Sequence, residues 1–149
     1  MIKKAVLPVA GFGTRFLPAS KSIPKEMLPI IDKPLVQYAV EEAINIGVDE
    51  IIFIISPEKY SIRKHFEKNE IFESRLKNSD KTEMISKLNP EIFSEIKFHY
   101  IDQEEQNGLG HAILQAEKVI GDNSFAVLLP DDLFFSCLLY TSDAADDFT

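Results

Sequence analysis

The chain has 149 residues, of which 45% are hydrophobic and 27% are charged, so its composition is that of one ordinary globular domain and not of a disordered chain. Its 24 acidic and 16 basic side chains leave a formal net charge of −8, which argues against a broad surface for nucleic acid or anionic membrane. The single cysteine, Cys137, excludes an internal disulfide framework, and no apolar run approaches the about 20 residues of a membrane helix, so we expect a cytoplasmic protein.

The first half of the chain predicts a strand, a loop, a helix, a second strand and a second helix. The run from Lys4 to Val9 is short and apolar and ends at a glycine loop, which is typical of a buried strand. A helix with one apolar face should begin at Pro34 and stop at Gly47. Residues 50–55 contain five consecutive apolar residues, the pattern of a strand covered on both faces, and Ser56-Pro57 begins the next helix.

The second half continues this alternation of strands and helices. Residues 67–95 are charged and weakly periodic, and Asp80 with Glu83 predicts a short helix there through a capping box. Two further strands and the helix between them are expected at 96–101, 110–119 and 125–129. The alternation predicts an α/β protein with a mostly parallel sheet and helices on both faces, and ligands in such folds bind beyond the carboxyl ends of the strands.

The loop Gly11-Phe12-Gly13-Thr14-Arg15 follows the first predicted strand, where glycines let backbone N–H groups approach a phosphate. The dinucleotide fingerprint does not fit, because Phe16 stands where the third glycine is needed, and the P-loop pattern does not occur. Residues 11–25 hold Arg15, Lys21 and Lys25 and no acidic side chain. This cationic segment favours a small polyanion such as a nucleotide, the alternative being a tight turn with solvated lysines.

Three segments together resemble the sugar-nucleotide pyrophosphorylases, the sugar nucleotidyltransferase family. They read AGFGTRFLPASKSIPKEMLPIIDKPLVQYAVEEA over 10–43, QEEQNGLGHAI over 103–113 and LLPDD over 128–132. PKEMLP followed by GLGHA resembles the bacterial UTP–glucose-1-phosphate uridylyltransferase branch, and a sister pyrophosphorylase that uses dTTP stays open. The resemblance covers roughly 2–135 and implies a Rossmann-like three-layer nucleotidyltransferase fold.

The resemblance also implies the site. Arg15 and Lys25 would be catalytic, Arg15 on the β- and γ-phosphates and Lys25 near the α-phosphate. Asp131 would hold Mg²⁺, with Asp132 a second candidate. The nucleotide-binding residues would be Ala10, Gly11, Gly13, Thr14, Arg15, Lys25, Gln103 and Gly108, of which Gln103 and Gly108 would read the uracil.

The implied reaction transfers a uridylyl group from UTP to glucose 1-phosphate and gives UDP-glucose and pyrophosphate. These small molecules are the expected partners, with no nucleic-acid polymer and no membrane, and the full-length protein is expected to be a homo-oligomer. Enzymes of this family are typically about twice as long, so residues 1–135 are expected to be the N-terminal part of a truncated domain. Residues 136–149 do not match the family, and we expect a non-native tail. The alternative is a catalytically incompetent fragment that binds UTP.

Overall fold

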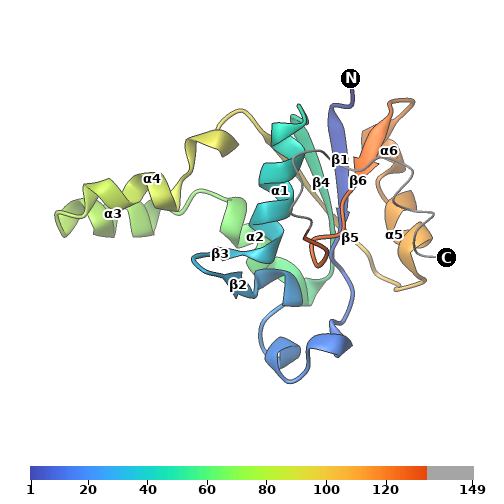
Figure 1. The fold of residues 1–149 in the computed structure, drawn as a ribbon, viewed down its shortest axis with the longest axis horizontal. Helices are drawn as coiled ribbons and strands as arrows, with labels where there is room; N and C mark the ends of the chain where they lie inside the picture. The colour runs from blue at the N-terminus through green and yellow to red at the C-terminus, as the bar shows by residue number, and fades with distance from the viewer. Residues whose placement is uncertain (134–149) are drawn as a thin grey trace.

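The computed structural model describes residues 1–133 and has one central sheet of four parallel strands (Figure 1). The strands follow the order β5-β4-β1-β6, and Val6 of β1 pairs with Ile52 of β4 on one side and with Val127 of β6 on the other. Their bounds are β1 (Lys4–Pro8), β4 (Glu50–Ile55), β5 (Lys97–Asp102) and β6 (Phe125–Val127). The expected parallel α/β architecture is confirmed. The expectation for residues 136–149 lies outside the described residues.

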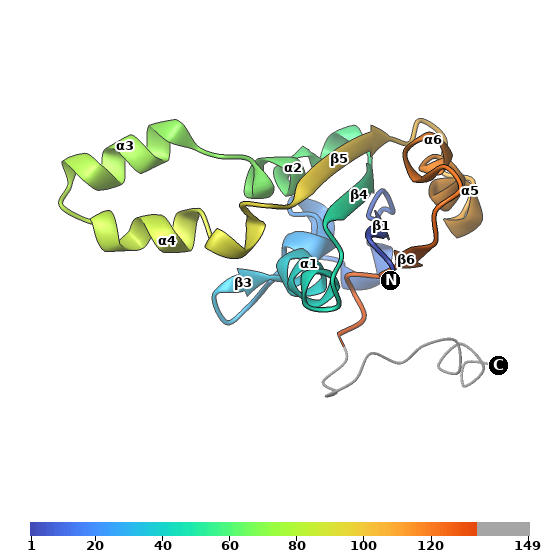
Figure 2. The ribbon, with the colours of Figure 1, turned by 90° about the horizontal axis from the view of Figure 1, so that it is seen from above.

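Helices cover both faces of this sheet, which gives three layers (Figures 1 and 2). On one face lie α1 (Leu35–Asn45) and α2 (Tyr60–Phe66), and on the other lie α5 (Leu109–Leu114) and α6 (Glu117–Ile120). The single helix expected over 110–119 is therefore two short helices. Helix α1 forms as expected and is followed by Gly47, whose φ of +97° suits a residue without a Cβ.

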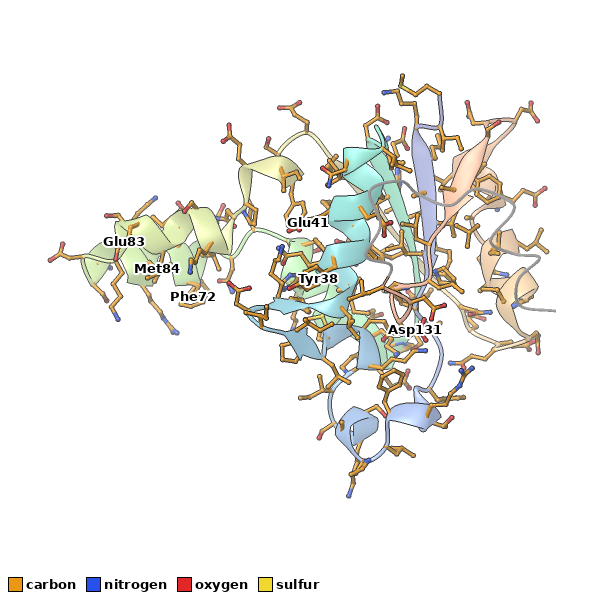
Figure 3. All side chains as sticks on the ribbon, in the orientation of Figure 1. Tyr38, Glu41, Phe72, Glu83, Met84 and Asp131 are labelled. Atoms are coloured by element: carbon orange, nitrogen blue, oxygen red, sulfur yellow. The ribbon has the colours of Figure 1, made fainter. Side chains whose placement is uncertain are left out.

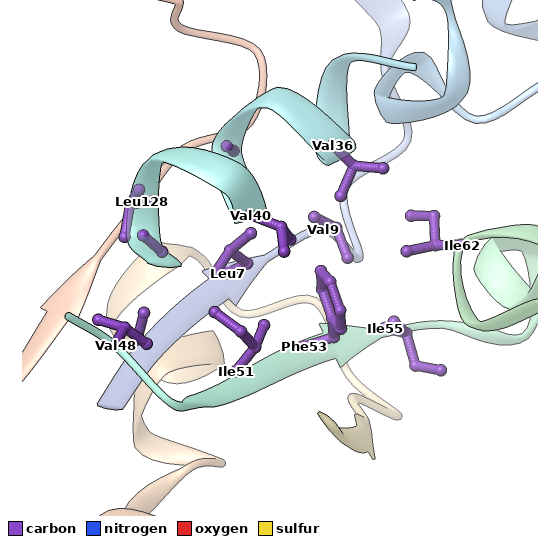
Figure 4. Packing of buried hydrophobic residues seen from close by; sticks show 13 residues of the cluster. Leu7, Val9, Val36, Val40, Val48, Ile51, Phe53, Ile55, Ile62 and Leu128 are labelled. Carbon is purple, nitrogen blue, oxygen red and sulfur yellow. The ribbon is translucent and has the colours of Figure 1, made fainter. Parts of the chain in front are cut away.

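The larger core lies between the sheet and α1 (Figure 4). Leu7 and Phe53 from the central strands are fully buried and meet Val36 and Val40 of the helix. Phe53 also stacks on Phe66, with ring centroids 5.3 Å apart. Burying one such side chain stabilises the fold by about 1.5–3 kcal/mol, so this layer anchors the strands whose ends carry the loops described below.

Residues 67–95 form a helical arm that projects away from the sheet (Figures 1 and 2). The arm contains α3 (Glu70–Asn78) and α4 (Ile85–Leu88), and none of its residues is buried. The capping box expected at Asp80 is wrong, because Asp80 lies in the turn between the helices with a φ of +52°. The side chain that caps is Asn69, whose Oδ1 accepts from the backbone N–H of Phe72 at 3.0 Å.

Short elements complete the described chain. A small antiparallel hairpin of β2 (Pro29–Ile30) and β3 (Lys33–Pro34) precedes α1. Single 3-10 turns lie at Thr14–Phe16, Ala19–Lys21, Lys25–Met27, Pro57–Lys59, Thr82–Met84 and Glu91–Phe93. Within residues 1–133, no helix has both the length and the apolar character needed to cross a membrane.

The hydroxyl of Tyr100 is buried without a hydrogen-bond partner among the described residues. Burial raises the pKa of Tyr100 far above its ordinary value. We expect Tyr100→Phe to raise the free energy of unfolding by about 1 kcal/mol, because the variant no longer buries an unpaired hydroxyl. Tyr38→Phe is the matched control, since the Tyr38 hydroxyl donates to the carbonyl of Ile30 at 2.8 Å and its loss should destabilise. Urea unfolding measures both, and a destabilised Tyr100→Phe contradicts the expectation.

Candidate functional site

The carboxyl ends of the four parallel strands bring the predicted site residues to one edge of the sheet. The glycine loop follows β1, Gln103 follows β5, and Asp131 lies beyond β6. Two side-chain contacts link the loops at this edge. Lys25 Nζ lies 2.8 Å from Asp131 Oδ2, and Gln106 Nε2 donates to the carbonyl of Ala10 at 2.7 Å.

The glycine loop is held by its own hydrogen bonds. Gly13 has a φ of +67°, and its carbonyl accepts from the hydroxyl of Ser20 at 2.6 Å and from the backbone N–H of Phe16 at 3.0 Å. A Cβ at Gly13 would lie 3.3 Å from the Lys25 side chain, so glycine is needed here for both backbone conformation and close packing. At Gly11 a Cβ would have nothing within 4 Å, which leaves open space beside the backbone.

Lys25 is the cation at the centre of the edge. It begins the 3-10 turn Lys25–Met27, its stem packs on Gly13, and its side chain is 20% exposed. Its Nζ lies 6.0 Å from the centroid of the Phe16 ring. A partly exposed ammonium group with one carboxylate partner keeps donors that can turn toward an incoming anion.

Asp131 is the acidic partner of Lys25 and lies at the lower end of the sheet in Figure 3. Burial alone would raise the pKa of Asp131, but the hydrogen bond and charge of Lys25 outweigh burial and lower this pKa, with a smaller contribution from Arg15. The carboxylate is therefore ionised at neutral pH. Residues 1–133 contain no group of three or more His, Cys, Asp or Glu side chains placed to hold a metal ion. One ionised carboxylate fits Mg²⁺, which usually takes one or two carboxylates and completes its shell with phosphates and water.

Gln103 lies apart from the Lys25–Asp131 pair. It is only 5% exposed, and its Nε2 lies 2.9 Å from Nδ1 of His111. A hydrogen bond from the Gln103 amide nitrogen to Nδ1 leaves the carbonyl oxygen of Gln103 available to a ligand. Gly108 precedes α5 with a φ of +92°, which suits glycine, and no atom lies within 4 Å of the position that its Cβ would take.

Two cavities flank the glycine loop and share Phe12, Ser56 and Glu58 in their walls. The larger, of about 600 Å³, opens between the ends of β4 and β5, and the smaller, of about 250 Å³, is lined by Ala10, Gly11 and residues 20–24 among others. The larger is lined by Phe12, Ser56, Pro57, Glu58, Tyr60, Asp102, Gln103, Glu104 and Gln106. Its size suits a drug-sized ligand, and Ser56 and Gln103 are the buried polar residues in its wall.

The structure brings Gly13, Lys25 and Asp131 into contact, whereas Thr14 and Arg15 lie exposed on the loop. Sequence reasoning missed two groups that shape the edge, the Ser20 hydroxyl and the Gln106 amide. Both act by hydrogen bonds to backbone carbonyls across a loop, and no spacing in the sequence indicates such contacts.

Comparison with known proteins gives consistent matches. The sequence profile of the family described as nucleotidyl transferase matches residues 4–146. The UTP–glucose-1-phosphate uridylyltransferase YngB of Bacillus subtilis (strain 168) is 50% identical over 135 residues, which cover 91% of this chain and 45% of that protein. The UTP–glucose-1-phosphate uridylyltransferase of Pseudomonas aeruginosa is 46% identical over 144 residues, which cover 97% of this chain and 50% of that protein.

Solved structures agree with the sequence matches. A UTP-bound UGPase from Acinetobacter baumannii superposes with a TM-score of 0.84 at 46% identity, over 88% of this chain and 46% of that one. A UDP-glucose pyrophosphorylase complexed with UDP-glucose superposes with a TM-score of 0.72 at 45% identity, over 92% of this chain and 48% of that one. The chain therefore spans about half the length of the relatives that it matches.

Proposed function

Because the chain belongs to the nucleotidyl transferase family, we propose that it carries the nucleotide-binding half of a UTP–glucose-1-phosphate uridylyltransferase. The reaction would give UDP-glucose and pyrophosphate. The observation that carries the proposal is the contact of Lys25 with Asp131 beside Gly13, a cation and an anion at the strand ends where a nucleotide triphosphate and its metal ion need them. Residues 1–135 would be the N-terminal part of the domain, and the full-length enzyme would be a homo-oligomer.

The glycine loop would bind the triphosphate. Gly11 offers open space beside its backbone for a phosphate, Ala10 and Gly13 would contribute neighbouring backbone groups, and Thr14 adds a hydroxyl donor. Arg15 is exposed on the same loop and would pair with the β- and γ-phosphates through its guanidinium fork. These contacts would stabilise the charge that builds up on the departing pyrophosphate.

Lys25 and Asp131 would act at the α-phosphate. Lys25 would turn from Asp131 toward the two anions that must approach each other, the α-phosphate and the sugar phosphate. Asp131 would then be free to hold Mg²⁺, which neutralises phosphate charge when bound. The ion pair lowers the pKa of Asp131 and keeps both groups close to where they are needed.

Gln103 and Gly108 would recognise the base. The Gln103 carbonyl can accept from the N3–H of uracil while its amide nitrogen stays on His111, which fixes the direction of the side chain. The open space beside Gly108 would admit the ring. Thymine has the same N3–H, so these contacts favour pyrimidines that carry it over cytosine.

The chemistry needs no general base on the protein. A phosphate oxygen of glucose 1-phosphate, already an anion, would attack the α-phosphorus of UTP and form a new P–O bond. The bond between the α-phosphorus and its bridging oxygen breaks, and pyrophosphate leaves with that oxygen and the electron pair. The residues above would act by orienting two anions and stabilising charge.

Two measurements on this chain test the proposal. Calorimetric titration with UTP, dTTP, CTP and ATP in Mg²⁺ should show binding of UTP, weaker or equal binding of dTTP, and little binding of CTP or ATP. Release of pyrophosphate from UTP should then depend on glucose 1-phosphate. UTP binding without this release would favour the binding fragment, and no binding of any nucleotide would contradict the proposal.

A further inference from the structure

The ion pair between Glu26 and Lys59 differs from the other ion pairs of residues 1–133. Lys59 Nζ lies 2.7 Å from Glu26 Oε2, and the two side chains are only 6% and 2% exposed. In every other ion pair of this part of the chain, both partners keep at least 20% exposure. Removing two charges from water is unfavourable and gives little net stability over apolar side chains of the same size, so the pair calls for a reason other than stability.

Glu26 lies next to Lys25 in a turn that has little stability of its own. The 3-10 turn Lys25–Met27 has three residues, is flanked by Pro24, and contributes the backbone bonds from Met27 N–H to Pro24 O and from Leu28 N–H to Lys25 O. A single 3-10 turn does not persist in water without tertiary contacts. Something outside the turn must therefore fix the direction of the Lys25 side chain.

Successive residues of a 3-10 turn point about 120° apart, because the turn repeats every three residues. When Glu26 points into the protein, Lys25 therefore points about 120° away from Glu26. Its stem packs on Gly13, and its Nζ contacts Asp131. Lys59 is itself fixed, because it ends the turn Pro57–Lys59 that follows β4 and its N–H donates to Ser56 O at 2.8 Å. The buried pair thus ties the turn of Lys25 to the end of a central strand.

We propose that Glu26 and Lys59 are positioning residues that orient Lys25 toward the nucleotide phosphates. Neither touches the reacting atoms, and both act through Lys25. This inference rests on the proposed function for its consequence on UTP, but the orientation of Lys25 can be measured without any nucleotide.

The test compares the wild-type chain with the double variant E26L/K59M, which replaces the charges by apolar side chains of similar size. Such a replacement should leave the melting temperature near the wild-type value. Acetylation of Lys25 by acetic anhydride, read by mass spectrometry against Lys21, should become several-fold faster, because Lys25 leaves Gly13 and Asp131. UTP affinity should fall about tenfold. The control E73L/K77M removes an ion pair of the helical arm with a 2.6 Å contact. It should change neither the acetylation rate of Lys25 nor the affinity for UTP.

A folded E26L/K59M with wild-type Lys25 reactivity would overturn the proposal and leave the pair a purely structural contact. If E26L/K59M does not fold, E26Q/K59M at low temperature decides in the same way, since it keeps the length of Glu26 and also leaves neither charge buried without its partner. If the wild-type chain binds no UTP, the proposed function fails, whereas the reactivity of Lys25 still tests the pair.

Discussion

A Lys25→Met variant is expected to bind UTP about 10- to 100-fold more weakly than the wild-type chain, the loss that accompanies one hydrogen bond to a charged group. Methionine keeps most of the unbranched stem that packs on Gly13 and removes the ammonium group. In an assay of pyrophosphate release the KM for UTP should rise with this loss of affinity, and kcat should fall as well, because the charge is needed most when the two phosphates meet.

The variant should remain folded. Loss of the Lys25 ammonium group leaves Asp131 without its ion-pair partner, but the Asp131 side chain is 27% exposed and can be hydrated in place. Calorimetric titration with UTP in Mg²⁺ gives the affinity, and a thermal melt of the same sample verifies the fold. The melting temperature should change little compared with the change in affinity.

Lys21→Met is the matched control for Lys25→Met. Lys21 is an exposed lysine of the same cationic segment and makes no ion pair among the described residues. Lys21→Met removes the same single positive charge as Lys25→Met. We expect a much smaller loss of affinity for Lys21→Met, which salt screens further. Equal losses in the two variants would mean that UTP affinity depends on the total positive charge of the segment and that Lys25 makes no specific contact with UTP.

The central layers were predictable because their residues satisfy a single requirement. The strand at Glu50–Ile55 is apolar on both faces and therefore has to be covered on both, and its bounds agree with the prediction. The helical arm was not predictable in the same way. Its residues stay exposed, so no core selects their periodicity, and its helices depend on local signals such as the Asn69 cap.

The site, likewise, could be predicted from the sequence only in part. The glycine loop and Lys25 were found because a resemblance to a family marks them and because the strand pattern ends where they begin. The contact of Lys25 with Asp131 spans 106 positions, and that of Glu26 with Lys59 spans 33. In the sequence, Glu26 within PKEMLP cannot be distinguished from an exposed acidic residue, because only the fold places Lys59 beside it.

An Asp131→Asn variant is expected to change UTP binding in opposite directions with and without metal. In EDTA the variant should bind UTP a few-fold more tightly than the wild type, because it removes a negative charge that repels phosphate and that occupies Lys25. In Mg²⁺ it should bind about tenfold more weakly, the loss of one charge-assisted contact. Titrations in the two buffers measure both affinities.

This change of sign separates three roles for Asp131. A carboxylate that only holds Lys25 in place would give weaker binding in both buffers once it is removed. A carboxylate with no role at the nucleotide would give no change in either. Only a group that carries the metal gives a gain in EDTA and a loss in Mg²⁺. Asp132→Asn is the control, since Asp132 is exposed beside it, and the same sign change there would move the metal ligand to Asp132.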